Sequence, residues 1–187
     1  MLARGQPIAC RRASRSLPCN QGLEALVFVP KGLPLGGTLI AISERGLDAA
    51  GNISGFLIGG PSPGGFAVKR SASYDVSDAA LLPGGDLLLL ERKFSWTSGS
   101  ACPHTAHRRL ARSSRVRLVD GPVLFEADLG YEIDNMEGLS VHRNAGGETV
   151  LTLISDDNFS LIPAHAAAAV HAGGAVNDDC RALGGQR

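Results

Sequence analysis

The chain has 187 residues, of which 44% are hydrophobic and 19% are charged, and these proportions exclude a wholly disordered or collagen-like protein. No apolar run approaches the ~18 residues that a transmembrane helix needs. The formal net charge is zero, which argues against a nucleic-acid-binding protein.

The zero net charge is the sum of segments with opposite charge. Residues 1–20 carry four Arg and residues 101–119 carry five, in both cases without an acidic residue. Residues 120–160 carry nine acidic residues and one Arg. Two interpretations of the central basic stretch stay open: a loop that binds anions or nucleic acid, and a solvated loop without a role. The second is favoured, because no aromatic residue lies between these arginines.

The N-terminal residues 1–19 form a basic leader that we expect to be irregular. This leader lacks the apolar core of a secretory signal peptide. The four Cys residues form no CxxC pair and have no zinc-finger spacing to a His, so we expect no zinc site. The chain also has no GxSxG motif and no P-loop motif. It therefore lacks the main sequence marks of an α/β-hydrolase nucleophile and of a nucleotide phosphate site.

Three segments in chain order share one plan of paired short strands. Apolar strands are expected over 22–30 and 38–45, then 76–82 and 86–92, then 135–143 and 148–155. Weaker strands are expected over 54–58, 66–70, 116–119 and 123–128. Short paired strands that repeat about every 50–60 residues favour an all-β fold, here a partial β-propeller of about three blades.

The expected propeller segment spans residues 20–160, with blades at about 21–72, 73–130 and 131–160. Residues 161–187 form an Ala- and Gly-rich tail that we expect to be irregular or weakly helical. The pattern also breaks in the central basic stretch. One hypothesis is that the stretches without the repeat are translated from another reading frame, because Arg, Ala, His and Cys collect in them: 100–117, 161–187 and the leader.

Acidic residues recur at corresponding points of the three repeats. Glu24, Asp78 and Glu137 stand at the start of the first strand of each pair. Glu44, Glu91 and Asp156 end the second strand, and Asp157 follows. Because the start of one strand and the end of its antiparallel neighbour lie at the same end of the pair, these carboxylates are expected on one rim. The alternative is that the repeat copies an acid which only binds backbone N–H groups.

An acidic rim suggests metal-assisted chemistry. Clustered carboxylates resist joint ionisation unless a cation lies among them, and oxygen ligands suit Ca²⁺ or Mg²⁺. Such a metal polarises a phosphoryl or carbonyl oxygen and activates a bound water. Arg45 and Arg92 each follow a rim acid directly, so they are expected to pair with a carboxylate or to bind an anionic substrate. His142 is interpreted as a strand residue and not as a catalytic base.

Several strings resemble the phytase-like family, which is described by the esterase-like activity of phytase. They are NQGLEAL, AISERGLDAAGNISGFL, DVSDAALLPGGDLLLLERKFS, GPVLFEADLGYEIDNMEGLSVHR and GETVLTLISDDNFS. The resemblance runs from about residue 20 to residue 160 and covers only the later part of the family's domain. It implies a β-propeller that hydrolyses phosphoesters or esters with the help of Ca²⁺ at an acidic rim.

Roles are predicted for individual residues. Catalytic roles are predicted for Glu137 and Asp156, and substrate binding is predicted for Arg45 and Arg92 because each follows a rim acid. The resemblance implies that the metal ligands are the matching acids Glu24, Glu44, Asp78, Glu91, Glu137, Asp156 and Asp157.

The expected partner is a small phosphorylated or ester substrate, with no nucleic acid and no membrane. Three blades do not close a ring, so oligomerisation through the open blade edges is also expected. The resemblance implies a periplasmic or extracellular location. Two alternatives to catalysis stay open: a propeller that only binds a partner, and an inactive fragment of such an enzyme.

Overall fold

The computed structural model describes Ile8, Leu17 and residues 21–71, 73–95, 100–108, 118–126, 136–156 and 167–171. These residues form β-strands, turns and irregular segments, and no helix occurs among them. The strands form three sheets, so the predicted all-β class is confirmed. No helix in the described part of the chain is long and apolar enough to cross a membrane.

Blade 1 is a five-stranded sheet with the order β1-β2-β3-β4-β8. The first four strands are antiparallel neighbours, and β8 runs parallel to β4. The bounds are β1 (Leu23–Phe28), β2 (Thr38–Leu47), β3 (Ile53–Gly59), β4 (Gly64–Val68) and β8 (Leu118–Val119).

Blades 2 and 3 follow the same antiparallel plan. Blade 2 has the order β5-β6-β7-β9, and blade 3 has the order β10-β11-β12. The strands of blade 2 are β5 (Asp75–Leu81), β6 (Leu87–Ser95), β7 (Ser100–Arg108) and β9 (Val123–Glu126). Those of blade 3 are β10 (Met136–Arg143), β11 (Thr149–Ser155) and β12 (Ala167–His171).

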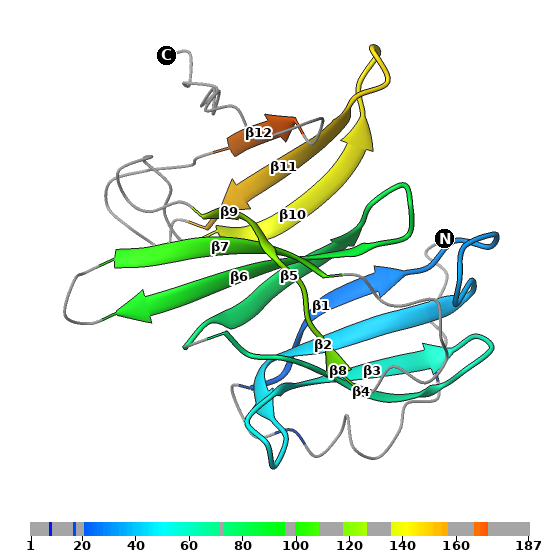
Figure 1. Ribbon diagram of the computed structural model, residues 1–187, viewed down its shortest axis with the longest axis vertical. Coiled ribbons are helices and arrows are strands. Elements are labelled where there is room, and N and C mark those ends of the chain that lie inside the picture. The colour runs from blue at the N-terminus through cyan, green and yellow to red at the C-terminus, as the bar shows by residue number, and fades with distance from the viewer. Residues whose placement is uncertain are drawn as a thin grey trace, which may run out of the picture.

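The three sheets lie side by side, with blade 2 between blades 1 and 3 (Figure 1). Strand β5 contacts both β1 and β10, so the first strands of the blades are neighbours. No sheet closes on itself. This arrangement is consistent with a partial β-propeller, as the sequence predicts.

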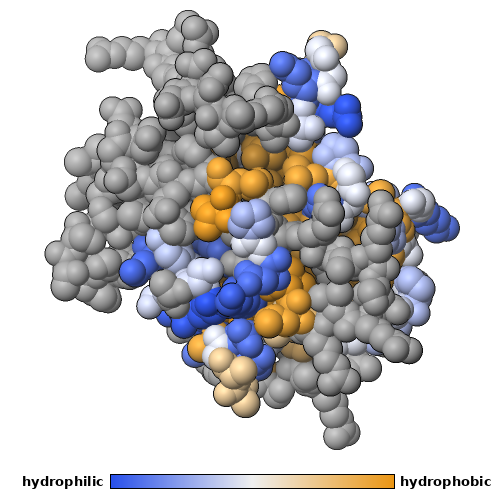
Figure 2. All heavy atoms as spheres, in the orientation of Figure 1, coloured by the Kyte–Doolittle hydropathy of each residue, from blue (hydrophilic) through white to orange (hydrophobic). Residues whose placement is uncertain are grey.

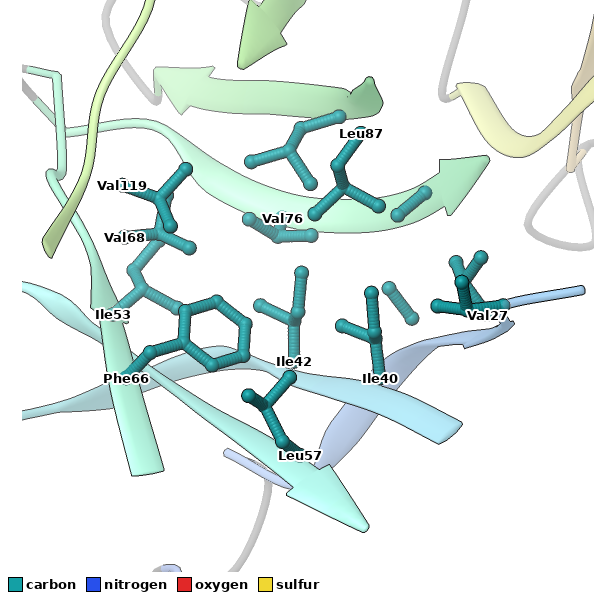
Figure 3. Close-up of a cluster of buried hydrophobic side chains, with 14 residues drawn as sticks. Val27, Ile40, Ile42, Ile53, Leu57, Phe66, Val68, Val76, Leu87 and Val119 are labelled. Atoms are coloured by element: carbon teal, nitrogen blue, oxygen red, sulfur yellow. The ribbon is translucent and has the colours of Figure 1, made fainter. Parts of the chain in front are cut away.

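The core consists of apolar layers between neighbouring blades. Leu87 and Leu89 of β6 pack toward blade 1, and Leu88 and Leu90 pack toward blade 3, all with 0% exposure. Because both faces of blade 2 are covered, β6 has four consecutive buried leucines where a half-buried strand would alternate. Each fully buried leucine contributes about 1.5–3 kcal/mol. Figure 3 shows the layer between blades 1 and 2, in which Val76 and Leu87 face Ile40 and Ile42.

Apolar side chains also remain on the outer surface. Leu26, Phe28 and Ile154 are each more than half exposed. Figure 2 shows hydrophobic surface beside a hydrophilic band on the face in view.

Three strands differ from the prediction. The stretch expected to be irregular contains β7, which pairs along its whole length with β6 and also pairs with β9. The tail contains β12, which pairs with β11. The neighbouring strands β6 and β11 are buried, and the backbone groups along their outer edges need hydrogen-bond partners. This requirement outweighs the low strand propensity of the two segments.

The third difference concerns residues 116–119, which were expected in blade 2. Strand β8 instead joins blade 1, where Lys69 N–H donates to Val119 O at 2.9 Å. Val119 is 1% exposed and belongs to the layer between blades 1 and 2. Burial of this side chain therefore decides the blade to which the segment belongs.

Candidate functional site

The rim is the end of the blades where each first strand begins and each second strand ends. Near this end, each first strand has an irregularity in its pairing register, between Leu23 and Ala25, Val76 and Asp78, and Met136 and Gly138. The extra residues at these β-bulges are Glu24, Ser77 and Glu137. A bulge bends its strand and redirects the side chain, so the three blades share one rim geometry.

The register corrects the sequence comparison in blade 2 by one residue. Ser77, and not Asp78, corresponds to Glu24 and Glu137. Glu91 lies opposite Val76, as Ser43 lies opposite Leu23. The residue that follows at the end of the second strand is then acidic in blade 1, basic in blade 2 and acidic in blade 3: Glu44, Arg92 and Asp156.

An ion-pair network runs along the rim through all three blades. Arg45 Nη2 lies 2.8 Å from Asp75 Oδ2 and 3.2 Å from Glu44 Oε1. Arg92 Nη2 lies 3.6 Å from Glu44 Oε1, and Arg92 Nη1 lies 2.6 Å from Glu137 Oε1. The two arginines thus connect carboxylates of neighbouring blades.

Sequence reasoning missed two members of this network. Arg70 pairs with Asp75 Oδ1 and also donates from Nε to Tyr74 O at 2.9 Å. Asp75 opens β5 directly opposite Arg92 in the register. The available signal was that Asp75 is an acid at the start of a strand, close in sequence to Arg70 and at the end of the blade where Arg45 was expected.

The other predicted acids have different surroundings. Asp78 Oδ2 accepts a hydrogen bond from Leu139 N–H at 2.7 Å, and Asp78 Oδ1 accepts one from Ala79 N–H at 2.7 Å. Asp78 therefore binds backbone N–H groups, as the alternative interpretation expected, and it joins blade 2 to blade 3. Glu91 is 1% exposed and lies inside the protein. Glu24 and Asp156 are exposed on blades 1 and 3.

The described residues provide no evident metal ligand set. Among them, no group of three or more His, Cys, Asp or Glu side chains is placed to hold a metal ion. Ca²⁺ takes six to eight oxygen ligands. The carboxylates of Glu44 and Glu137 instead both contact the Arg92 guanidinium. The metal prediction for Asp157 lies outside the described residues.

A comparison with models of protein families shows the family to which this sequence belongs. The family model described as Phytase-like, esterase-like activity of phytase, matches residues 5–159. The chain covers most of the family's domain and not only its later part, so the expected extent of the resemblance was too short. The matched range includes most of the basic leader and the central stretch. No curated protein and no solved structure gives a significant match.

Proposed function

We propose that this chain, which belongs to the phytase-like family, hydrolyses phosphate or carboxylate esters at the rim around Arg45, Arg92 and Glu137. Family membership supports a hydrolase. The observation that carries the location is the Arg92 guanidinium between Glu44 and Glu137, because it joins cationic and carboxylate groups at one place.

Arg45 is the proposed ligand of the substrate's anionic group. Its side chain is 47% exposed, and both of its ion pairs in the structure use Nη2. A guanidinium has five N–H donors in a planar fork, so Arg45 retains donors for a phosphate or carbonyl oxygen. A bidentate contact of this kind would orient the ester over the rim.

Glu137 and Asp156 are the proposed acid–base pair. Glu137 follows Met136 and Asp156 follows Ser155, and Met136 and Ser155 are paired in register, so both carboxylates belong to the rim end of blade 3. In the proposed step one carboxylate accepts a proton from a water that attacks the phosphorus or carbonyl carbon. The other donates a proton to the leaving ester oxygen. The ion pair with Arg92 orients the Glu137 carboxylate for this role.

Calcium assistance is a separate proposal that comes from the family resemblance. When bound, Ca²⁺ supplies Lewis-acid activation of the ester oxygen. The carboxylates of Glu44 and Glu137 do not fit a calcium site as they stand, since Arg45 and Arg92 form ion pairs with them. No step above depends on the metal.

A second candidate function is binding without turnover. It is favoured by the fact that the rim contacts join blades: Arg45 reaches Asp75, Arg92 reaches Glu137, and Asp78 reaches the backbone of β10. Such contacts suit a scaffold that holds a recognition surface together.

The experiment measures hydrolysis of p-nitrophenyl phosphate and p-nitrophenyl acetate by the full chain, with added Ca²⁺ and with a chelator. Glu137→Gln and Asp156→Asn are each expected to lower kcat about 10²–10⁴-fold, whereas Arg45→Met is expected mainly to raise KM. The matched control is Glu148→Gln, an exposed acid in the turn between β10 and β11. Turnover that is equal in all four variants refutes the assignment. Calorimetric binding of phosphate without any turnover supports the second candidate.

A further inference from the structure

The register assigns each strand position to one face of its blade. Leu26 in β1, Ala79 in β5 and Leu139 in β10 occupy the same position after the bulge. Ala79 packs in the layer shared with blade 1, and Leu139 packs in the layer shared with blade 2. This position therefore faces the preceding blade. In blade 1, Leu26 is 60% exposed.

The same pattern recurs two residues later in the strands. Leu81 of β5 packs against the layer with blade 1, and Val141 of β10 packs against the layer with blade 2. Their counterpart in β1 is Phe28, which is 59% exposed. Blade 1 thus exposes two large apolar side chains at positions that blades 2 and 3 cover with a preceding blade.

Charges follow the same rule. A basic residue near the end of one blade's second strand pairs with an acid near the start of the next blade's first strand. Arg45 pairs with Asp75 at 2.8 Å, and Arg92 pairs with Glu137 at 2.6 Å. Glu24 is the counterpart of Glu137 at the bulge of β1 and is exposed. A preceding blade would place a cation opposite Glu24.

Part of this outer face is already covered. Leu17 packs with Ala41, Phe56 and Ile58, which belong to β2 and β3. Leu26, Phe28 and Glu24 lie on β1, next to that cluster, and remain exposed. The surface open to a partner is therefore centred on β1.

We propose that the outer face of β1 docks a further β-sheet blade, which covers Leu26 and Phe28 with aliphatic side chains and places an Arg or Lys against Glu24. The shape and polarity of this partner blade are inferred from the two contacts between blades inside the chain. Both contacts have an apolar layer with an ion pair at its rim. Apolar burial supplies the affinity and the ion pair fixes the register of docking.

A second copy of this chain matches the apolar requirement but not the charge. Ile154 of blade 3 corresponds to Leu90 of blade 2, and it is 57% exposed. The residue of blade 3 that corresponds to Arg92 is Asp156. Docking of blade 3 on β1 of another copy would bring Asp156 near Glu24, and like charges at an interface suppress association. The favoured partner is therefore a different blade with a basic residue at that position.

The test uses a charge-reversed copy of the chain as the probe. Asp156→Arg gives blade 3 the cation that the proposal requires, so this variant is expected to self-associate at least about tenfold more tightly than the wild type in sedimentation equilibrium. Added salt is expected to weaken the association. Adding Glu24→Arg to this variant is expected to return association to the wild-type level, and adding Phe28→Ser is expected to weaken it.

The matched control is Glu148→Arg, which makes the same charge change at the opposite end of the β10–β11 hairpin and is expected to leave association unchanged. Circular dichroism establishes that each variant is folded, and Asp156→Lys repeats the test if Asp156→Arg is not. A folded Asp156→Arg variant that associates no more than the wild type overturns the proposal. So does association that Glu24→Arg leaves intact. Tight association of the wild type through β1 would identify a second copy as the occupant and would also overturn it.

Discussion

The contact between Arg92 and Glu137 allows a quantitative test of how the blades are held together. Arg92→Met keeps most of the aliphatic stem and removes the charge that lies 2.6 Å from Glu137 and 3.6 Å from Glu44. The side chains of Arg92 and Glu137 are 27% and 31% exposed. Exposed ion pairs contribute about 0–1 kcal/mol, and loss of one partner from a fully buried pair costs about 3–5 kcal/mol.

Because both side chains are mostly but not fully buried, the expected cost of Arg92→Met lies between these limits, at about 1–2 kcal/mol. Glu44 keeps its contact with Arg45 at 3.2 Å in the variant, which holds the cost below the buried limit. For a chain of this size the loss corresponds to a fall in Tm of roughly 2–8 °C.

A double-mutant cycle with Glu137→Gln separates the pair from other effects of each substitution. Urea unfolding followed by circular dichroism is expected to give a coupling free energy of about 1 kcal/mol. If the two free-energy changes add within about 0.3 kcal/mol, the ion pair does not hold blade 2 to blade 3 and the reasoning is wrong.

Three further predictions concern the fold around the rim. Gly55→Ala would place a Cβ within 2.5 Å of the Phe66 ring, which is 6% exposed, so unfolding free energy is expected to fall by about 1–3 kcal/mol in urea. Asp78→Ala removes the acceptor of Leu139 N–H, which is expected to cost about 1–3 kcal/mol and to speed hydrogen exchange of that amide. Backbone N–H donation from residue 52 holds the pKa of Asp48 below its usual value. The contribution of the Asp48 carboxylate to stability is therefore present above about pH 4 and is lost as pH falls through its folded-state pKa. NMR titration of the Asp48 side chain measures this pKa.

Each of these predictions has a control in the same structure. Gly65→Ala meets only Gly55 O at 3.8 Å, so a loss as large as that of Gly55→Ala would contradict the steric argument. Asp78→Asn keeps one of the two acceptor oxygens, so its loss of stability is expected to be smaller than that of Asp78→Ala. An Asp48 carboxyl that titrates at or above the ordinary value of about 4 contradicts the third prediction.

Blade order was predictable from the sequence because apolar runs and Gly turns are local signals. Strand β6 shows this, since its four leucines stand between a Gly-Gly turn and a charged end. Strands β7 and β12, and the blade that β8 joins, were not predictable in the same way. Their pairing depends on the edge that a neighbouring strand leaves open, and sequence windows carry no information about that edge.

The rim was predictable as a place but not in its chemistry. The acids at 44 and 137 were found because they flank strands in each repeat. Asp78, in contrast, follows the bulge residue Ser77 and binds the backbone of β10, whereas Glu24 and Glu137 occupy the bulges of their strands. At a bulge two residues of one strand lie opposite one residue of its partner, so positions counted along the sequence differ by one from the pairing. The register of an acid next to a bulge therefore has to be read from the pairing.

The charges that meet at the rim are balanced, although the charges along the sequence are segregated. Arg45, Arg70 and Arg92 alternate with Glu44, Asp75 and Glu137, so the charges of this network are balanced inside the blades. An anionic ester that binds here competes with carboxylates that also hold the blades together. Binding through the donors that Arg45 does not use for its ion pairs would leave the network intact, whereas displacement of Glu137 from Arg92 would loosen the contact between blades 2 and 3. The proposed function would therefore couple substrate recognition to blade packing through the guanidinium groups of Arg45 and Arg92.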